Sequence, residues 1–211
     1  MRLILGGIAL VLAGTLTGCV DGGTVNEGEP TRAACQLLNR VDRETIDGTA
    51  IDREMPAEGN LGPRENQCGW ASRKANIRVI SMASTTWADV LPAALDQLEK
   101  LPQVKLSAAD RAKLDEGRKL LDDKALLPDQ ACDLFVTLAK LEDGQDGSNE
   151  VIRYLPLNDG QAMTISAQTC SDGRFTSVTY TTDGMQKSVE LEETMADLRY
   201  VAHRRAIRQD L

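Results

Sequence analysis

Two stretches of similar sequence, each containing one cysteine and each followed by a second, constrain the fold of this 211-residue chain more than any other feature. Residues 34–41 begin with Ala-Cys and then place large apolar residues at the same positions as residues 131–138. A second cysteine follows each stretch, after 33 residues in the first case (68 − 35) and 38 in the second (170 − 132). The order of the expected secondary-structure elements also repeats, so the pattern predicts two related halves.

The N-terminus has the layout of an export signal. One basic residue, Arg2, precedes an apolar segment that runs from Leu3 to Leu16 and is too short to span a bilayer comfortably. Leu16-Thr17-Gly18-Cys19 resembles the lipobox of bacterial lipoproteins. This resemblance implies cleavage before Cys19 and attachment of acyl chains, such as palmitate, to that cysteine. A transmembrane anchor and an ordinary secretion signal are the alternatives.

Composition limits the partners of the cleaved protein. Loss of residues 1–18 removes Arg2 and changes the formal charge from -8 to -9 (-8 − 1). An acidic chain is a poor partner for nucleic acid and for anionic lipid surfaces, and only 3% of the residues are aromatic. We therefore expect the acylated Cys19 to hold the protein on the extracytoplasmic face of the cell membrane.

The cysteine count agrees with export. Five is an odd number, and acylation of Cys19 accounts for the odd one. The other four lie in a compartment that permits disulfides, where three connectivities exist. The repeat favours Cys35 with Cys68 and Cys132 with Cys170, because each pair then joins a helix to a strand within one half. Four free thiols are the alternative.

Apolar periodicity and turn signals predict an α+β fold with antiparallel strands. The expected strands cover residues 49–55, 66–72, 75–82, 151–155, 162–170 and 175–182. Each half should begin and end with a helix: from Thr31 to about Asp47 and from Thr86 in the first, and at 131–138 and 187–207 in the second. Pro92 is expected to kink or split the second of these helices. The predicted organisation is a signal peptide (1–18), a flexible tether (19–30), a first half (31–102), a connector helix (103–129) and a second half (130–211).

Three short motifs resemble those of actinobacterial envelope lipoproteins of unknown function. They are Ala-Cys-Gln-Leu-Leu at 34–38, Gln-Cys-Gly-Trp at 67–70, and Gln-Thr-Cys-Ser-Asp-Gly-Arg-Phe-Thr-Ser-Val at 168–178. The resemblance implies a lipid-anchored location and a fold type. It carries no catalytic residues, because the family has no agreed activity.

Candidate catalytic and metal-binding residues are few. His203 is the only histidine, and a Ser-His-Asp triad would have to use it. It lies among Arg199, Arg204, Arg205 and Arg208, so we expect it to complement the dipole of the last helix, and the basic end to be solvated or to touch anionic groups. One histidine and disulfide-bound cysteines leave too few ligands for zinc, so no metal or cofactor is expected. Trp70 and Trp87 are expected in the core near the first disulfide.

The sequence therefore predicts a lipid-anchored envelope protein that is not an enzyme. Its expected role is that of a binding or accessory module for an envelope protein or a small ligand. The alternative is an extracytoplasmic hydrolase that uses acidic residues, which would need two facing carboxyl groups in a cleft, one with a raised pKa.

Overall fold

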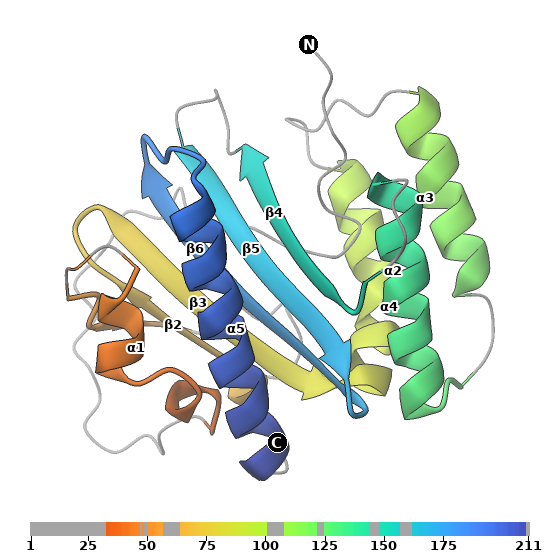
Figure 1. Ribbon diagram of the computed structural model, residues 1–211. Helices are drawn as coiled ribbons and strands as arrows, with labels where there is room; N and C mark the ends of the chain where they lie inside the picture. Colours follow the sequence, from red (N-terminus) through yellow and green to blue (C-terminus); the bar gives the residue numbers. More distant parts are fainter. Residues whose placement is uncertain are drawn as a thin grey trace.

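The protein has an α+β fold built on one antiparallel sheet (Figure 1). The computed structural model describes residues 33–46, 48, 50–56, 64–100, 108–121, 125–143, 148–156 and 162–209. The strands are β1 (Arg53–Met55), β2 (Gln67–Ala71), β3 (Ala75–Ala83), β4 (Glu150–Pro156), β5 (Ala162–Ser171) and β6 (Arg174–Asp183). They form a six-stranded sheet in the order β1-β2-β3-β6-β5-β4. The predicted α+β class with antiparallel strands is confirmed. The predicted signal peptide, the predicted tether and Cys19 lie outside the described residues.

Helices and short helical turns connect and cover the strands. They are η1 (Ala33–Gln36), α1 (Arg40–Glu44), η2 (Arg64–Asn66), α2 (Ser84–Lys100), α3 (Ala108–Leu120), α4 (Pro128–Asp143) and α5 (Val189–Gln209). The predicted connector helix corresponds to α3. Helix α2 passes through Pro92 without being split, contrary to one of the two expectations for that residue.

The first predicted helix is the clearest local error. In place of one helix from Thr31, the chain forms η1 and then α1, because Asn39 caps a new helix. The Asn39 side chain accepts a hydrogen bond from the Asp42 amide, and the Asp42 carboxylate accepts one from the Asn39 amide. Val41 is 70% exposed, whereas Leu37 and Leu38 are fully buried.

Side-chain alternation along the strands divides the core between the two faces of the sheet. On β3, Ile77 and Val79 point to one face and Met82 to the other. The first face, with α5 lying across it (Figure 1), carries the α5-side core. This core consists of Ala34, Leu37, Leu38, Ile51, Cys68, Trp70, Ala75, Ile77, Val79, Ile165, Ala167, Val178, Tyr180, Met195, Leu198, Ala202 and Ala206.

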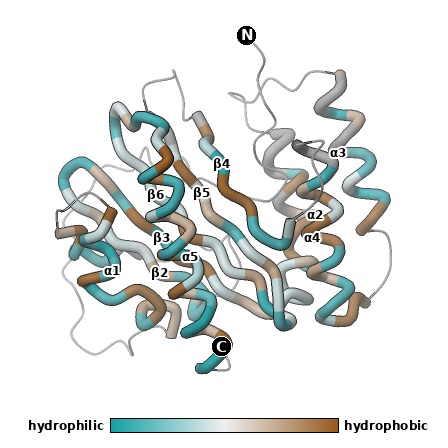
Figure 2. Tube along the Cα trace, in the orientation of Figure 1, coloured by the Kyte–Doolittle hydropathy of each residue, from teal (hydrophilic) through white to brown (hydrophobic). Residues whose placement is uncertain are grey.

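The second face carries the α4-side core at one end of the sheet. Helices α2 and α4 pack together there, and hydrophobic segments gather along them in Figure 2. Trp87, Phe135 and Phe175 form an aromatic cluster with ring centroids 5.3 to 5.8 Å apart. This cluster joins α2, α4 and β6 into one packed unit.

The two predicted halves contribute to a single sheet. Each half has the order helix, three antiparallel strands, helix, and β3 of the first pairs with β6 of the second. The opening turn η1 lies in the α5-side core, however, whereas the opening helix α4 lies in the α4-side core. A rotation that overlays the strands would therefore place the opening helices on opposite faces, and the two-halves architecture is not confirmed.

Both predicted disulfides are present. Cys35 bonds to Cys68 with a Cα–Cα separation of 5.0 Å, and Cys132 bonds to Cys170 with a separation of 5.1 Å. The first links η1 to β2, and the second links α4 to β5, so each joins a helical element to the middle strand of its half.

Candidate functional site

His203 is the centre of a buried polar network at one end of the sheet. Its Nε2 atom lies 2.8 Å from the Ser171 hydroxyl, and its Nδ1 atom lies 2.9 Å from the Thr176 hydroxyl. Thr176 in turn contacts the Ser81 hydroxyl at 3.0 Å, and Ser171 contacts the Asp172 carboxylate at 3.2 Å. The network thus joins α5 to β3 and to the hairpin between β5 and β6.

Local sequence explains how the hairpin presents these groups. Asp172 and Gly173 have φ angles of 50° and 69°, which two-residue hairpin turns require and which glycine adopts without strain. The tight turn places Ser171 and Arg174 opposite each other at the end of the ladder. Ser171 remains half-buried and Asp172 is exposed, so the network reaches solvent at the turn.

Burial sets the charge of the histidine. His203 is 6% exposed, and desolvation lowers its pKa. Arg199 and Arg174 lower the pKa further, whereas Asp172 and Glu150 oppose the shift. The neutral imidazole is therefore the favoured form at neutral pH.

A salt bridge lies one helical turn from His203. Arg199, whose side chain is 6% exposed, places Nη1 2.7 Å from Oε1 of Glu150 at the start of β4. The hydrogen bond from Arg199 is the main cause of the lowered pKa of Glu150. This pair fixes the outer strand of the sheet to the same face of α5 that carries His203.

The network satisfies its hydrogen bonds in a way that orients the imidazole. When Ser171 donates to the Asp172 carboxylate, Nε2–H donates to Ser171, Thr176 donates to Nδ1, and Ser81 donates to Thr176. In a Ser-His-Asp triad the carboxylate contacts the imidazole nitrogen remote from the serine. Here that nitrogen faces a hydroxyl, and Asp172 contacts the serine instead. The arrangement docks α5 and does not reproduce a triad.

The expected role of His203 at the helix dipole is therefore wrong. Its side chain lies in the protein interior, on the helix face that also buries Met195, Leu198 and Ala202. The helical spacing of Arg199 and His203 with those apolar residues is the signal that could have placed both of them inside. The serine and threonine partners come from strands distant in sequence and carry no signal of their own.

The four arginines near the end of the last helix lie in different environments. Arg199 pairs with Glu150, and Arg205 donates to the Leu37 carbonyl at 2.9 Å and forms a salt bridge with Asp42. Arg204 and Arg208 are exposed. The four arginines therefore do not form one patch.

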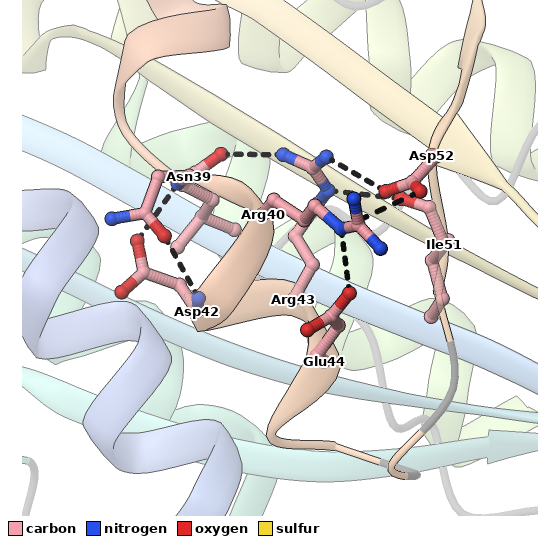
Figure 3. Close-up of polar contacts among 8 residues, drawn as sticks. Asn39, Arg40, Asp42, Arg43, Glu44, Ile51 and Asp52 are labelled. Atoms are coloured by element: carbon pink, nitrogen blue, oxygen red, sulfur yellow. Dashed lines mark hydrogen bonds and ion pairs between the residues drawn. The ribbon is translucent and has the colours of Figure 1, made fainter.

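Polar contacts within the N-terminal segment join residues 38–44 to residues 51 and 52, directly before β1 (Figure 3). Arg43 donates from Nε to the Ile51 carbonyl at 2.9 Å and from Nη1 to the Leu38 carbonyl at 2.8 Å. Its guanidinium carbon lies 4.3 Å from the centre of the Trp70 ring, and its Nη2 lies 3.4 Å from Asp52. Trp70 thus lies in the core beside the first disulfide as expected, whereas Trp87 packs in the core of the second.

The opposite face of the sheet contains a second polar region. Cross-strand pairing aligns Arg78, Thr179, Ser166 and Arg153 in one row across β3, β6, β5 and β4. Arg153 and Ser166 are 9% and 1% exposed, and Gln168 donates to Ser166 at 3.0 Å. Guanidinium and hydroxyl groups at such low exposure are costly to bury unless they are hydrogen-bonded or paired.

Comparisons with known proteins identify no relative. No family model matches the chain, and neither a curated protein nor a solved structure matches it. In the part of the chain that the structure describes, no helix is both long and apolar enough to cross a membrane.

Proposed function

We propose that this chain is a lipid-anchored protein of the cell envelope whose folded part is a non-catalytic binding or accessory module. The observation that carries the proposal is the Leu16-Thr17-Gly18-Cys19 motif at the end of an apolar segment with a basic start. Acylation of Cys19 is the chemistry that this motif implies. The membrane is then the first partner of the protein, and an envelope protein or a small ligand is the second.

The disulfides support an extracytoplasmic location. Both close in the structure with Cα separations in the ordinary range for such bonds. Structural disulfides persist in oxidising compartments and are rare in the bacterial cytosol. A chain with two of them and an export signal is consistent with a protein that folds outside the cytoplasm.

The polar row from Arg78 to Arg153 supports a binding role for the folded part. It combines two cationic side chains with two hydroxyls on four adjacent strands. The carboxyl groups give the hydrolase alternative no comparable support. The hydrogen bond from Arg199 lowers the pKa of Glu150, whereas a general acid needs a raised pKa.

Substitution of the acylated cysteine tests the proposal. The Cys19→Ser protein, expressed in the native cell, should leave the membrane fraction or accumulate uncleaved, and it should no longer incorporate labelled palmitate. Cys35→Ser is the matched control, because it also removes one thiol and should remain acylated. Retention of a correctly cleaved, unlabelled Cys19→Ser protein in the membrane would contradict the anchor.

A further inference from the structure

The two disulfides differ in what lies beside them. The Cys35 sulfur lies 3.7 Å from the Glu54 carboxylate, and the ligand atoms of Cys35, Glu54 and Cys68 all lie within 4.8 Å of one another. This is the one group of three or more potential metal ligands among the described residues. The Cys132–Cys170 disulfide lies in the apolar α4-side core, as Cys68 lies in the α5-side core, but among the described residues no such group of ligands includes it.

We propose that reduction of the Cys35–Cys68 disulfide creates a binding site for a thiophilic divalent cation such as Zn²⁺, with Cys35, Cys68 and Glu54 as ligands. A dithiol reductant supplies two electrons and two protons, the S–S bond breaks, and the dithiol becomes a disulfide. The metal then displaces the two thiol protons and binds both thiolates. Thiol–disulfide exchange with a disulfide oxidant, which takes up the two electrons, takes two protons from water and becomes a dithiol, would restore the Cys35–Cys68 bond and release the metal.

The spacing of Cys35 and Glu54 fits a tetrahedral ion, and the two sulfurs, which are bonded to each other here, move apart on reduction. Zinc lies about 2.3 Å from a thiolate sulfur and about 2.0–2.2 Å from a carboxylate oxygen. Two such ligands on a tetrahedron are therefore roughly 3.5–3.6 Å apart, which is close to the 3.7 Å between Cys35 Sγ and Glu54 Oε1. Two thiolates and one carboxylate leave a fourth position for water.

The site keeps its shape without the disulfide, because other contacts hold its three elements. Glu54 on β1 pairs with Trp70, two residues from Cys68 on β2. The segment that carries Cys35 is held by hydrogen bonds from Arg205 and Arg43 to the Leu37 and Leu38 carbonyls. Both leucines are fully buried. Reduction thus frees two sulfurs within an otherwise ordered site.

The first disulfide is more accessible to solvent than the second, as the proposal requires. Cys35 is half-buried and Glu54 is exposed, whereas Cys68 is 1% exposed, so a reductant and a metal reach the site from the Cys35 side. Cys132 and Cys170 are 9% and 1% exposed in a core that contains aromatic rings. Thiolates prefer zinc and related ions, and a carboxylate in place of a third thiolate keeps the site reversible.

Cobalt(II) is the probe that tests the site, because its absorption reports thiolate ligands and coordination number. The full chain carrying Cys19→Ser is reduced with a phosphine, freed of reductant without oxygen, and titrated with Co²⁺. We expect a thiolate-to-cobalt charge-transfer band that saturates at one ion per chain, the visible bands of a four-coordinate ion, and displacement by Zn²⁺. The oxidised protein should show none of these signals.

Variants assign the ligands. In the same background, Glu54→Gln should weaken Co²⁺ binding about tenfold or more, since even outer-shell groups commonly contribute tenfold to a hundredfold. Glu190→Gln, an exposed acid on α5, is the matched control and should bind normally. Cys35→Ser should abolish the charge-transfer band, whereas the double variant Cys132→Ser/Cys170→Ser should keep it.

Several results would overturn the proposal. One is a reduced protein without the charge-transfer band, and another is equal affinity in Glu54→Gln. A third is a band that survives Cys35→Ser, which would place the metal on the other cysteine pair. Near-ultraviolet circular dichroism follows the fold throughout, and a reduced chain that stays unfolded with excess Zn²⁺ would also count against the site.

Discussion

The Cys35–Cys68 disulfide joins a segment with little regular structure to the sheet, whereas the Cys132–Cys170 disulfide joins a long helix to a long strand. Around the first, much of the order comes from polar contacts, because Arg43 and Arg205 bind the backbone carbonyls of Leu37, Leu38 and Ile51. Around the second, it comes from interlocking aromatic rings.

The comparison shows that a disulfide can stabilise two different kinds of region, one ordered largely by polar contacts and one ordered by apolar packing. A segment of 14 described residues, 33–46, contains only η1 and the short helix α1, so it has few backbone hydrogen bonds of its own. It needs side-chain donors to satisfy its carbonyl groups. Helix α4 satisfies its own backbone and contributes apolar side chains. Perturbing packing, cross-links and polar contacts separately should therefore distinguish the two regions.

The largest effect is expected from Phe135→Ala in the second region. Phe135 is fully buried between Trp87 and Phe175, and its removal leaves a cavity among rings that cannot easily close it. We expect the free energy of unfolding to fall by about 3–5 kcal/mol, measured by urea denaturation with both disulfides intact. A loss below about 1 kcal/mol would show that the aromatic cluster does not organise this region.

The paired variants Cys35→Ala/Cys68→Ala and Cys132→Ala/Cys170→Ala compare the two cross-links directly. Their loops span 33 and 38 residues, so chain entropy predicts nearly equal losses of roughly 4 kcal/mol. A difference between the two losses in unfolding free energy beyond this would reflect how tightly the native cysteine side chains are packed. Denaturation of each variant checks this, and we expect the second pair to be the more damaging, because both of its sulfurs are buried in the apolar core.

Arg43→Ala should weaken the first region by an intermediate amount. It removes the donors to two buried carbonyls and the cation above Trp70, and we expect a loss of about 2–3 kcal/mol in the free energy of unfolding. Arg40→Ala is the matched control, because Arg40 lies on the same helix and makes only exposed ion pairs. Equal losses in the two variants would show that the buried carbonyl contacts do not matter.

Strand positions and disulfides could be predicted because their signals are local or repeated. The strands expected at 75–82, 162–170 and 175–182 coincide with β3, β5 and β6, and the last two form a hairpin through a two-residue turn. The pairing of β3 with β6 could not be predicted. No local sequence feature distinguishes a strand at the edge of a separate three-stranded sheet from one that pairs with a strand of a second group.

The candidate site was missed for a related physical reason. The end of a helix that is rich in basic residues is usually solvated. The charges around His203 therefore favoured an exposed position, although His203 shares a helix face with the buried Met195 and Ala202. Its hydroxyl partners Ser171 and Thr176 lie about 30 residues away along the chain, and serine or threonine on a strand is unremarkable in sequence. They are recognisable as partners of His203 only in the folded structure, where α5 packs onto the sheet.

The smallest effect is expected from protonation of His203, which tests whether the polar contacts on the α5 side respond to pH. Because burial lowers its folded pKa, the unfolded chain binds the proton more readily. The stability it contributes is present above the unfolded pKa of about 6.5 and is lost as pH falls from there toward the folded pKa. Glu150 adds a second loss at lower pH, because Arg199 lowers its folded pKa as well.

The network limits the size of this loss. When His203 carries a proton on both nitrogens, Nε2–H donates to Ser171, whose hydroxyl donates to the Asp172 carboxylate, and Nδ1–H donates to Thr176. Urea denaturation between pH 7.5 and pH 5 should therefore show a modest decline in the wild type and a flatter profile in His203→Gln, whose amide does not titrate. Asp172→Asn should steepen the decline, because an amide is a weaker acceptor than a carboxylate and no longer stabilises the imidazolium. Identical profiles in all three proteins would show that His203 is not the group that titrates.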